Sequence, residues 1–175
     1  MDLKDHIRSI PDFPKPGIMF RDVTTLFGHA EALKHAVDRL AAPFAGSGIA
    51  MVAGIEARGF ALAGVLADRL QAGFIPIRKA GKLPHQTVAE GYALEYGEAT
   101  LEMHMDAVTK GARVLLVDDL IATGGTAIAA LSLLRQMGAD VVGCGFLIDL
   151  PDLGGSNRLR ANCDHVITLV DYGGH

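Results

Sequence analysis

The chain has 175 residues, 50% of them hydrophobic and 21% charged, which is the composition of one globular domain with a substantial core. Its net charge of −4 at pH 7 argues against a surface that coats nucleic acid, so an anionic ligand must be met by a local group of cations. No apolar stretch is long enough to cross a bilayer, so we expect no membrane as a partner, and the net charge leads us to expect no nucleic acid.

In chain order, a short amphipathic start is followed by a proline-rich stretch over residues 11–17 that cannot be regular helix. Beyond it, apolar residues occur either at helical spacing or in short continuous runs. The predicted helices cover residues 31–40, 59–71 and 125–137, the last ending at Gly138. The predicted strands cover residues 49–55, 74–77, 92–96, 100–104, 113–117, 141–148 and 165–170.

Helices alternate with strands that are continuous apolar runs, and no repeat or domain boundary interrupts the order. This pattern predicts a single α/β domain over residues 1–175, with a mostly parallel twisted sheet and helices on both faces. Ligands bind beyond the carboxyl ends of the strands in such sheets. Three strands end in polar, glycine-bearing segments, at residues 56–59, 78–82 and 118–126, so we expect these segments to meet at one rim.

The most informative segment is V-L-L-V-D-D-L-I-A-T-G-G-T, residues 114–126. An apolar strand ends in Asp118 and Asp119, and the small-residue loop at 122–126 then opens a helix. Glycines let the backbone approach an anion, a helix N-terminus favours negative charge, and the acids can bind sugar hydroxyls. The plain alternative is an acidic turn and a helix capped by a threonine of the loop, but a cap does not explain two glycines beside two acids. No lysine follows the glycines, which excludes a Walker loop. The segment therefore predicts a site for a sugar phosphate.

Two further positions have both a structural and a functional interpretation. Arg58, in the turn E-A-R-G, could pair with Glu56 or grip phosphate oxygens with its planar guanidinium. Phe20, just after the proline-rich stretch, could be a core anchor or an aromatic platform for a flat ligand.

A basic cluster of Arg78, Lys79 and Lys82 begins a stretch rich in glycine and proline that lacks apolar periodicity. Such clusters are commonly solvated surface. The length of the stretch, about residues 79–93, is also that of a mobile lid loop over a site.

Cysteine and histidine give little further chemistry. Cys144 and Cys163 belong to no C-x-x-C pair or disulfide framework, so we expect two reduced thiols. No histidine pattern indicates zinc, and we expect no metal held by side chains alone. Residues 1–16 lack the apolar region of a signal peptide, which favours a cytoplasmic protein.

Together these segments resemble the type I phosphoribosyltransferases, whose signature is the strand, acid pair and T-G-G-T loop at 114–126. Some members of that superfamily carry an acid where this loop has Ala122, which is a minor departure. Four further segments narrow the resemblance to the members that act on adenine. They are F-P-K-P-G-I-M-F-R-D, G-I-E-A-R-G-F, I-R-K-A-G-K-L-P and Y-A-L-E-Y-G. The signature that positions 6-oxopurines downstream of the T-G-G-T loop is absent.

The resemblance implies conversion of adenine and 5-phosphoribosyl-1-pyrophosphate to AMP and pyrophosphate in purine salvage. It also implies the type I phosphoribosyltransferase fold with an N-terminal base-binding hood over about residues 1–30, a homodimer, and Mg²⁺ bound mainly through the pyrophosphate substrate.

The resemblance also implies residue roles. The 5′-phosphate would be bound by backbone amides and hydroxyls of Ala122, Thr123, Gly124, Gly125 and Thr126. The ribose hydroxyls and the positive charge on the ring would be met by Asp118 and Asp119. Pyrophosphate would be bound by Arg58, Arg78, Lys79 and Lys82, one of the last three reaching across the dimer interface.

For the base, the resemblance implies that Phe20 stacks on adenine while the backbone of Met19 and Arg21 reads its edge. Glu95 and Tyr96 would close over the site, with Glu95 moving a proton at the attacking nitrogen.

Three rival functions stay open at this point. The first is the same fold acting on another base, such as xanthine or orotate. The second is a regulator that binds phosphoribosyl pyrophosphate to control transcription, but prolines at 11, 14 and 16 leave no room for a winged helix. The third is a phosphoacceptor signalling domain, in which the T-G-G-T loop would have no use.

Overall fold

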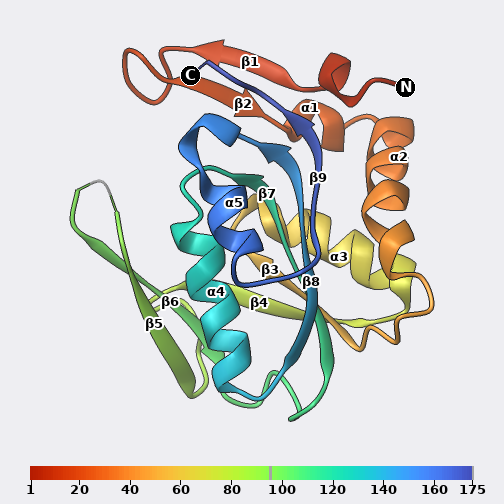
Figure 1. Cartoon of the computed structure of the whole chain (residues 1–175), viewed down its shortest axis with the longest axis vertical. Helices are drawn as coiled ribbons and strands as arrows, with labels where there is room; N and C mark the ends of the chain where they lie inside the picture. Colours follow the sequence, from red (N-terminus) through yellow and green to blue (C-terminus); the bar gives the residue numbers. More distant parts are fainter. Residues whose placement is uncertain (95, 175) are drawn as a thin grey trace.

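Over residues 1–94 and 96–174, which the computed structural model describes, the chain forms a seven-stranded sheet and a separate two-stranded hairpin (Figure 1). The sheet order is β5-β6-β4-β3-β7-β8-β9. Its strands are β3 (Met51–Ile55), β4 (Gly73–Lys79), β5 (Thr87–Ala93), β6 (Glu98–His104), β7 (Arg113–Ile121), β8 (Asp140–Asp149) and β9 (Val166–Asp171). Strands β4, β3, β7, β8 and β9 are parallel, and β5 with β6 forms an antiparallel hairpin at one edge. The predicted mostly parallel sheet is confirmed.

Helices cover both faces of the sheet, as predicted. On one face lie α2 (Ala30–Ala41) and α3 (Arg58–Leu70), and on the other α4 (Gly125–Gln136) and α5 (Gly155–Arg160) (Figure 1). Successive side chains of a strand point to opposite faces, so Leu115 of β7 belongs to the first core and Leu116 to the second. The remaining helical segments are η1 (Leu3–His6), α1 (Thr24–Phe27), η2 (Ala42–Phe44) and η3 (Pro151–Leu153). None of the described helices has the length and apolarity needed to cross a membrane.

Two strands run further than their apolar residues indicate. Strand β7 continues to Ile121 because residues beyond Val117 still pair with β8, up to Ile121 opposite Asp149. Strand β4 continues to Lys79, which pairs with Leu101 of β6. The two acids interrupt the apolar run of β7, but Ile121 beyond them is again buried in the second core. The acid pair and the first two basic residues therefore lie on strands rather than in loops.

The segment 79–93, predicted as one loop, is strand over its second half. Thr87–Ala93 pairs with Glu98–His104 along its whole length, and the predicted strand at 92–96 is therefore placed too late. Val88 and Tyr92 pack against the second core, whereas Ala89 and Gly91 are exposed, and this packing stabilises a strand that has few large apolar residues. Whether this hairpin moves as a lid stays a prediction.

The N-terminal hairpin lies across the carboxyl ends of the parallel strands (Figure 1). It consists of β1 (Arg8–Pro11) and β2 (Met19–Asp22), joined by the proline-rich turn. In that turn the Asp12 carboxylate accepts a hydrogen bond of 2.8 Å from the Gly17 amide. We call residues 8–22 the hood hairpin.

Candidate active site

The T-G-G-T loop joins β7 to α4 and leaves the start of that helix uncapped. Gly124 is the N-cap residue, with φ at +86°, and no side chain of the described residues caps the helix. The alternative in which a threonine caps α4 is therefore wrong. The first amides of a helix have no partner within it, so here they are available to an anion. Together with Asp118, residues 120–127 line a cavity of about 170 Å³ at this place.

Helix α5 holds the T-G-G-T loop in place through two hydrogen bonds to its backbone carbonyls. The Gly155 amide donates to the Ala122 carbonyl at 3.0 Å, and Arg158 Nη1 donates to the Thr123 carbonyl at 2.6 Å. A Cβ atom on Gly124 would lie 2.9 Å from the Gly155 carbonyl oxygen, so both contact points need glycine. Sequence reasoning missed this support, although the glycine pair at 154–155, a few residues after the predicted strand at 141–148, was an available signal.

The acid pair lies on the last part of β7, with Asp119 buried and Asp118 half-buried, and it is joined to Arg58. Asp119 is 5% exposed, and its carboxylate accepts a hydrogen bond from Arg58 Nε, so the alternative pairing of Arg58 with Glu56 is wrong. The Asp119 amide donates to Asp118 Oδ1 at 2.9 Å. Burial, together with the neighbouring Asp119 carboxylate, raises the pKa of Asp118 well above its ordinary value. Burial alone would lower the pKa of Arg58, but the charges of Asp119 and Asp118 raise it, so the guanidinium stays charged.

The first turn of α3 approaches the acids closely. A Cβ atom on Gly59 would lie 2.7 Å from Asp118 Oδ1. Glycine at this position therefore lets the turn that carries Arg58 reach the end of β7.

The basic cluster surrounds a single buried carboxylate. Glu56, whose side chain is 8% exposed, accepts from Lys82 Nζ and from the Lys79 amide, each at 2.5 Å, and its Oε2 lies 3.7 Å from Arg78 Nη2. Burial would raise the pKa of Glu56, but the hydrogen bonds from Lys82 and Lys79 and the charge of Arg78 hold it below its ordinary value. Sequence reasoning had not assigned Glu56 this part. Glu56 thus holds Arg78, Lys82 and the backbone of Lys79 in an ordered cationic wall, in which Lys79 and Lys82 stay exposed to solvent.

A second cavity, of about 330 Å³, connects the strand ends. Its walls include residues 55–58, Lys79, Tyr92 and both acids. It shares Asp118, Leu120 and Thr126 with the cavity of the T-G-G-T loop. The three polar segments therefore meet at one rim, as the sequence predicts.

Phe20 stands at the same rim on the hood hairpin. It is half-buried and belongs to neither core, so its interpretation as a core anchor is wrong. Its ring centroid lies 5.4 Å from Arg58 Cζ and 5.1 Å from the Phe13 ring, which meets it edge-on.

The outer edge of β2 can present backbone groups to a ligand. Pro11, which pairs with Met19, has no N–H, so these two residues cannot exchange both ladder hydrogen bonds. Such pairs alternate with hydrogen-bonded ones along an antiparallel ladder. The peptide groups of Met19 and Arg21 therefore face away from β1.

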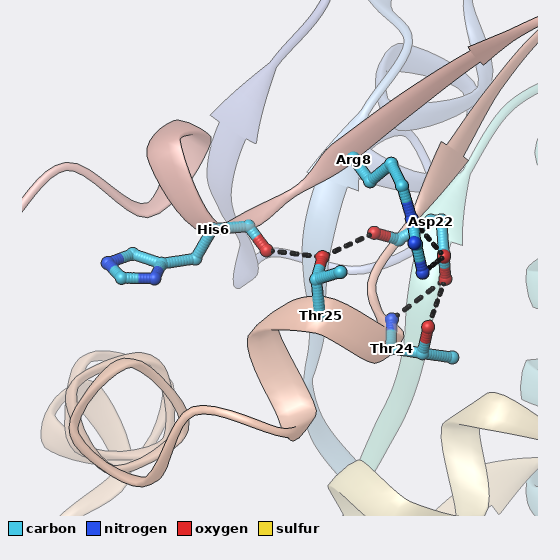
Figure 2. Close-up of polar contacts among 5 residues, drawn as sticks. All are labelled: His6, Arg8, Asp22, Thr24 and Thr25. Carbon is cyan, nitrogen blue, oxygen red and sulfur yellow. Dashed lines mark hydrogen bonds and ion pairs between the residues drawn. The ribbon is translucent and has the colours of Figure 1, made fainter.

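A buried carboxylate anchors the hood hairpin to α1 (Figure 2). Asp22, 8% exposed, accepts from Thr24 Oγ1 at 2.6 Å, from the Thr24 amide at 2.9 Å and from Arg8 Nη2 at 2.7 Å. Thr25 Oγ1 donates to the His6 carbonyl at 2.7 Å and so connects α1 to η1. The hydrogen bonds from Thr24, assisted by Arg8, lower the pKa of Asp22 against the effect of burial. Sequence reasoning missed this anchor, which depends on residues far apart in the chain.

The tip of the β5–β6 hairpin reaches the turn of the hood. Tyr96 is 80% exposed, and Lys15 Nζ lies 5.7 Å from its ring centroid. Glu95 lies outside the described residues, so its role stays a prediction. Within residues 1–94 and 96–174, no group of three or more His, Cys, Asp or Glu side chains is arranged to hold a metal ion.

Comparison with known proteins gives one consistent result. The family model for the phosphoribosyl transferase domain matches residues 27–169. The adenine phosphoribosyltransferase of Nitrobacter hamburgensis is 64% identical over 174 residues, covering 99% of this chain and 97% of that protein. The crystal structure of the adenine phosphoribosyltransferase from Rhodothermus marinus is 54% identical, with a TM-score of 0.93 over 97% of this chain and 96% of that one. The enzyme from Giardia lamblia complexed with 9-deazaadenine is 32% identical, with a TM-score of 0.92 over 100% of this chain and 99% of that one.

Proposed function

The chain belongs to the phosphoribosyltransferase family, within it to the adenine phosphoribosyltransferases, and from this premise we propose how its residues divide the reaction among them. It converts adenine and 5-phosphoribosyl-1-pyrophosphate to AMP and pyrophosphate, which is a purine-salvage reaction. The observation that carries the residue assignment is the wall that the two cavities share, where the uncapped start of α4 meets Asp118, next to the buried Asp119.

The loop at 122–126 binds the 5′-phosphate through its amides and the hydroxyls of Thr123 and Thr126. This assignment is supported by the left-handed Gly124, the missing cap of α4 and the cavity beside them. Five residues thus act on the end of the substrate that does not react, and so fix the position of the ribose ring.

Asp118 and Asp119 bind the ribose hydroxyls and face the positive charge that develops on the ring as the bond to pyrophosphate breaks. Burial makes the negative charge of the pair costly in the free enzyme, as the raised pKa of Asp118 indicates. Positive charge on the ribose ring in the transition state offsets that cost, so the pair stabilises the transition state more than the substrate, whose ring is uncharged.

Arg58, Arg78, Lys79 and Lys82 bind the departing pyrophosphate. Their support is the cationic wall around Glu56 and the position of Arg58 between the acids and Phe20. Mg²⁺ would be held mainly through the diphosphate of the substrate, whose oxygens are the hard ligands that this ion prefers. When bound, it neutralises negative charge on the leaving group.

Adenine lies on Phe20, and the backbone of Met19 and Arg21 reads its edge. The free edge of β2 and the half-exposed Phe20 ring support this placement. Tyr96, with Glu95, closes over the base from the hairpin tip, and Glu95 moves a proton at the attacking nitrogen. Closure excludes water, which otherwise competes for the ribosyl centre.

The protein acts in the cytoplasm as a homodimer, in which one residue of the basic cluster reaches the partner's site. Two exposed large apolar side chains support an interface on the side of the molecule that carries α3 and the start of β4. They are Val65 of α3, at 40% exposure, and Phe74 of β4, at 38%.

A competition assay tests the proposed function. Purified protein is mixed with Mg²⁺, phosphoribosyl pyrophosphate and labelled adenine, with unlabelled xanthine or orotate in excess. We expect labelled AMP at an undiminished rate. Suppression of AMP by xanthine or orotate, with formation of their nucleotides, would assign the site to another base.

A further inference from the structure

The two cysteines of the chain lie together, far from the strand ends that form the active site. Cys144 is in β8, and Cys163 is in the turn between α5 and β9. Their Sγ atoms are 3.9 Å apart, and both thiols are free. None of the roles above uses them.

Only one of the two sulfurs can be reached from outside. Cys144 is fully buried, whereas Cys163 is 5% exposed and lines a polar cavity of about 290 Å³. The cavity lies at the opposite ends of the strands, with Arg113, Asp140 and Arg135 among its wall residues. A small polar oxidant can therefore reach Cys163 but not Cys144.

The contact between the thiols makes them chemically unequal. The hydrogen bond that Cys144 donates lowers the pKa of Cys163 to about 6, and the charge of Arg135 acts in the same direction, against burial and the charge of Asp164. The same bond, together with burial, raises the pKa of Cys144. Thiolates rather than thiols are the nucleophiles, so the reachable sulfur is also the reactive one.

We propose that Cys163 and Cys144 form a redox-active dithiol, in which a hydroperoxide oxidises Cys163 and Cys144 then closes an intramolecular disulfide. In the first step the Cys163 sulfur attacks a peroxide oxygen and the O–O bond breaks, giving a sulfenic acid and, after protonation, an alcohol. In the second step the Cys144 sulfur attacks the Cys163 sulfur, the S–O bond breaks, and the oxygen leaves as water. Two thiols are oxidised and one hydroperoxide is reduced. The sulfur atoms need to approach only from 3.9 Å to the bonded distance of about 2.05 Å.

The disulfide would enclose the element that supports the phosphate loop. The segment between the cysteines contains α5, and with it Gly155 and Arg158, which donate to the T-G-G-T loop. A covalent link across this segment restricts its unfolded conformations, so we expect the oxidised protein to melt at a higher temperature than the reduced one.

The test uses the full chain treated with hydrogen peroxide and then quenched. We expect the thiol count after denaturation to fall from two to none, with a mass loss of two hydrogens that dithiothreitol reverses, and a raised Tm. Cys144→Ser should stop at a sulfenic acid on Cys163, trapped by dimedone as a single adduct. Cys163→Ser should keep Cys144 reduced, because that thiol is buried.

Two results would overturn the proposal. One is a folded wild-type protein that keeps both thiols at peroxide concentrations that oxidise free cysteine. The other is a disulfide found only between molecules. Because both readouts use the wild-type chain, they hold even if a serine variant fails to fold. Circular dichroism and activity under reducing conditions, which we expect to match the wild type, serve as controls for the variants.

Discussion

At the scale of single residues, Arg58 is the point where three parts of the site meet. It begins α3, its guanidinium binds Asp119, and it lies against the Phe20 ring. In the proposed division of roles, a side chain so placed acts on pyrophosphate while it holds Asp119 in position.

Arg58→Ala should lower kcat/KM at least tenfold, which corresponds to about 1.4 kcal/mol. The loss combines a missing cation on the leaving group with an Asp119 carboxylate that no longer has its partner. Steady-state kinetics with both substrates measure it. Arg69→Ala, on the same helix but paired with the surface residue Asp38, is the matched control and should leave kcat/KM unchanged. Wild-type kinetics for Arg58→Ala would remove this residue from the site.

Asp118→Asn should lower turnover strongly without loss of the fold, and adding Asp119→Asn should nearly abolish it. A carboxyl whose pKa is raised in the folded state binds its proton more tightly there, so stability falls as pH rises from about 3.9 toward the folded pKa. Removing the charge at Asp118 removes that penalty. We therefore expect the Tm of Asp118→Asn at pH 7 to equal or exceed that of the wild type, the difference shrinking in acid. Full activity of the double variant with an unchanged circular dichroism spectrum would contradict the sugar-binding role.

At the scale of elements, α3 needs one glycine in its first turn for the site and carries a second, one turn later, that the site does not need. Gly59→Ala places a methyl group 2.7 Å from Asp118 Oδ1, so we expect the acid to be displaced and kcat/KM to fall at least tenfold. Gly64→Ala, in the same helix and with open space around it, should leave activity unchanged and raise stability by about 1 kcal/mol. Kinetics and thermal unfolding of both variants separate the two effects. Equal activity of both variants would show that the close approach has no role.

Helix α5 contacts the candidate active site through the T-G-G-T loop, to which Gly155 and Arg158 donate hydrogen bonds. Arg158→Ala removes the donor to the Thr123 carbonyl, so we expect KM for phosphoribosyl pyrophosphate to rise several-fold with a smaller change in KM for adenine. Arg160→Ala is the matched control, because that side chain donates to Asn157 in the same helix and not to the T-G-G-T loop. If both variants gave the same kinetics, α5 would have no specific effect on the loop.

The elements that sequence alone predicts are those with a regular apolar pattern. The parallel strands and helices α2, α3 and α4 have such patterns, so their existence and order were predictable. Strand β5 was placed too late and helix α5 was missed, because one is stabilised by pairing with β6 and the other by hydrogen bonds to the T-G-G-T loop. The acids and the loop were found because their residue types occur together in the chain. The roles of Glu56 and Asp22 were not, since the basic partners Lys82 and Arg8 lie 26 and 14 residues away in sequence.

At the scale of the whole molecule, the site is assembled from a rigid part and an added part. The parallel strands hold the acids, the T-G-G-T loop and the cationic wall at their carboxyl ends, and the sheet has a core on each face. The hood hairpin brings Phe20 to that edge, and it depends on local anchors such as the network around Asp22 (Figure 2). The phosphate and sugar subsites should therefore survive a loosened hood, whereas the adenine subsite should not.

Asp22→Ala tests this division. It leaves Arg8 and Thr24 without their shared acceptor, so we expect KM for adenine to rise at least tenfold and KM for phosphoribosyl pyrophosphate to change little. The pKa of Asp22 is lowered in the folded state, so its contribution to stability is present above the ordinary pKa of an aspartate and is lost as pH falls through the folded value. The loss of unfolding free energy in the variant should accordingly be largest near neutral pH, at roughly 1–3 kcal/mol, and should vanish in strong acid. Thermal unfolding of wild type and variant across this pH range measures it as a difference in Tm. Asp5→Ala, an exposed acid of the same N-terminal region, should change neither constant. A rise of both KM values together in Asp22→Ala would mean that the hood and the sheet form one cooperative site.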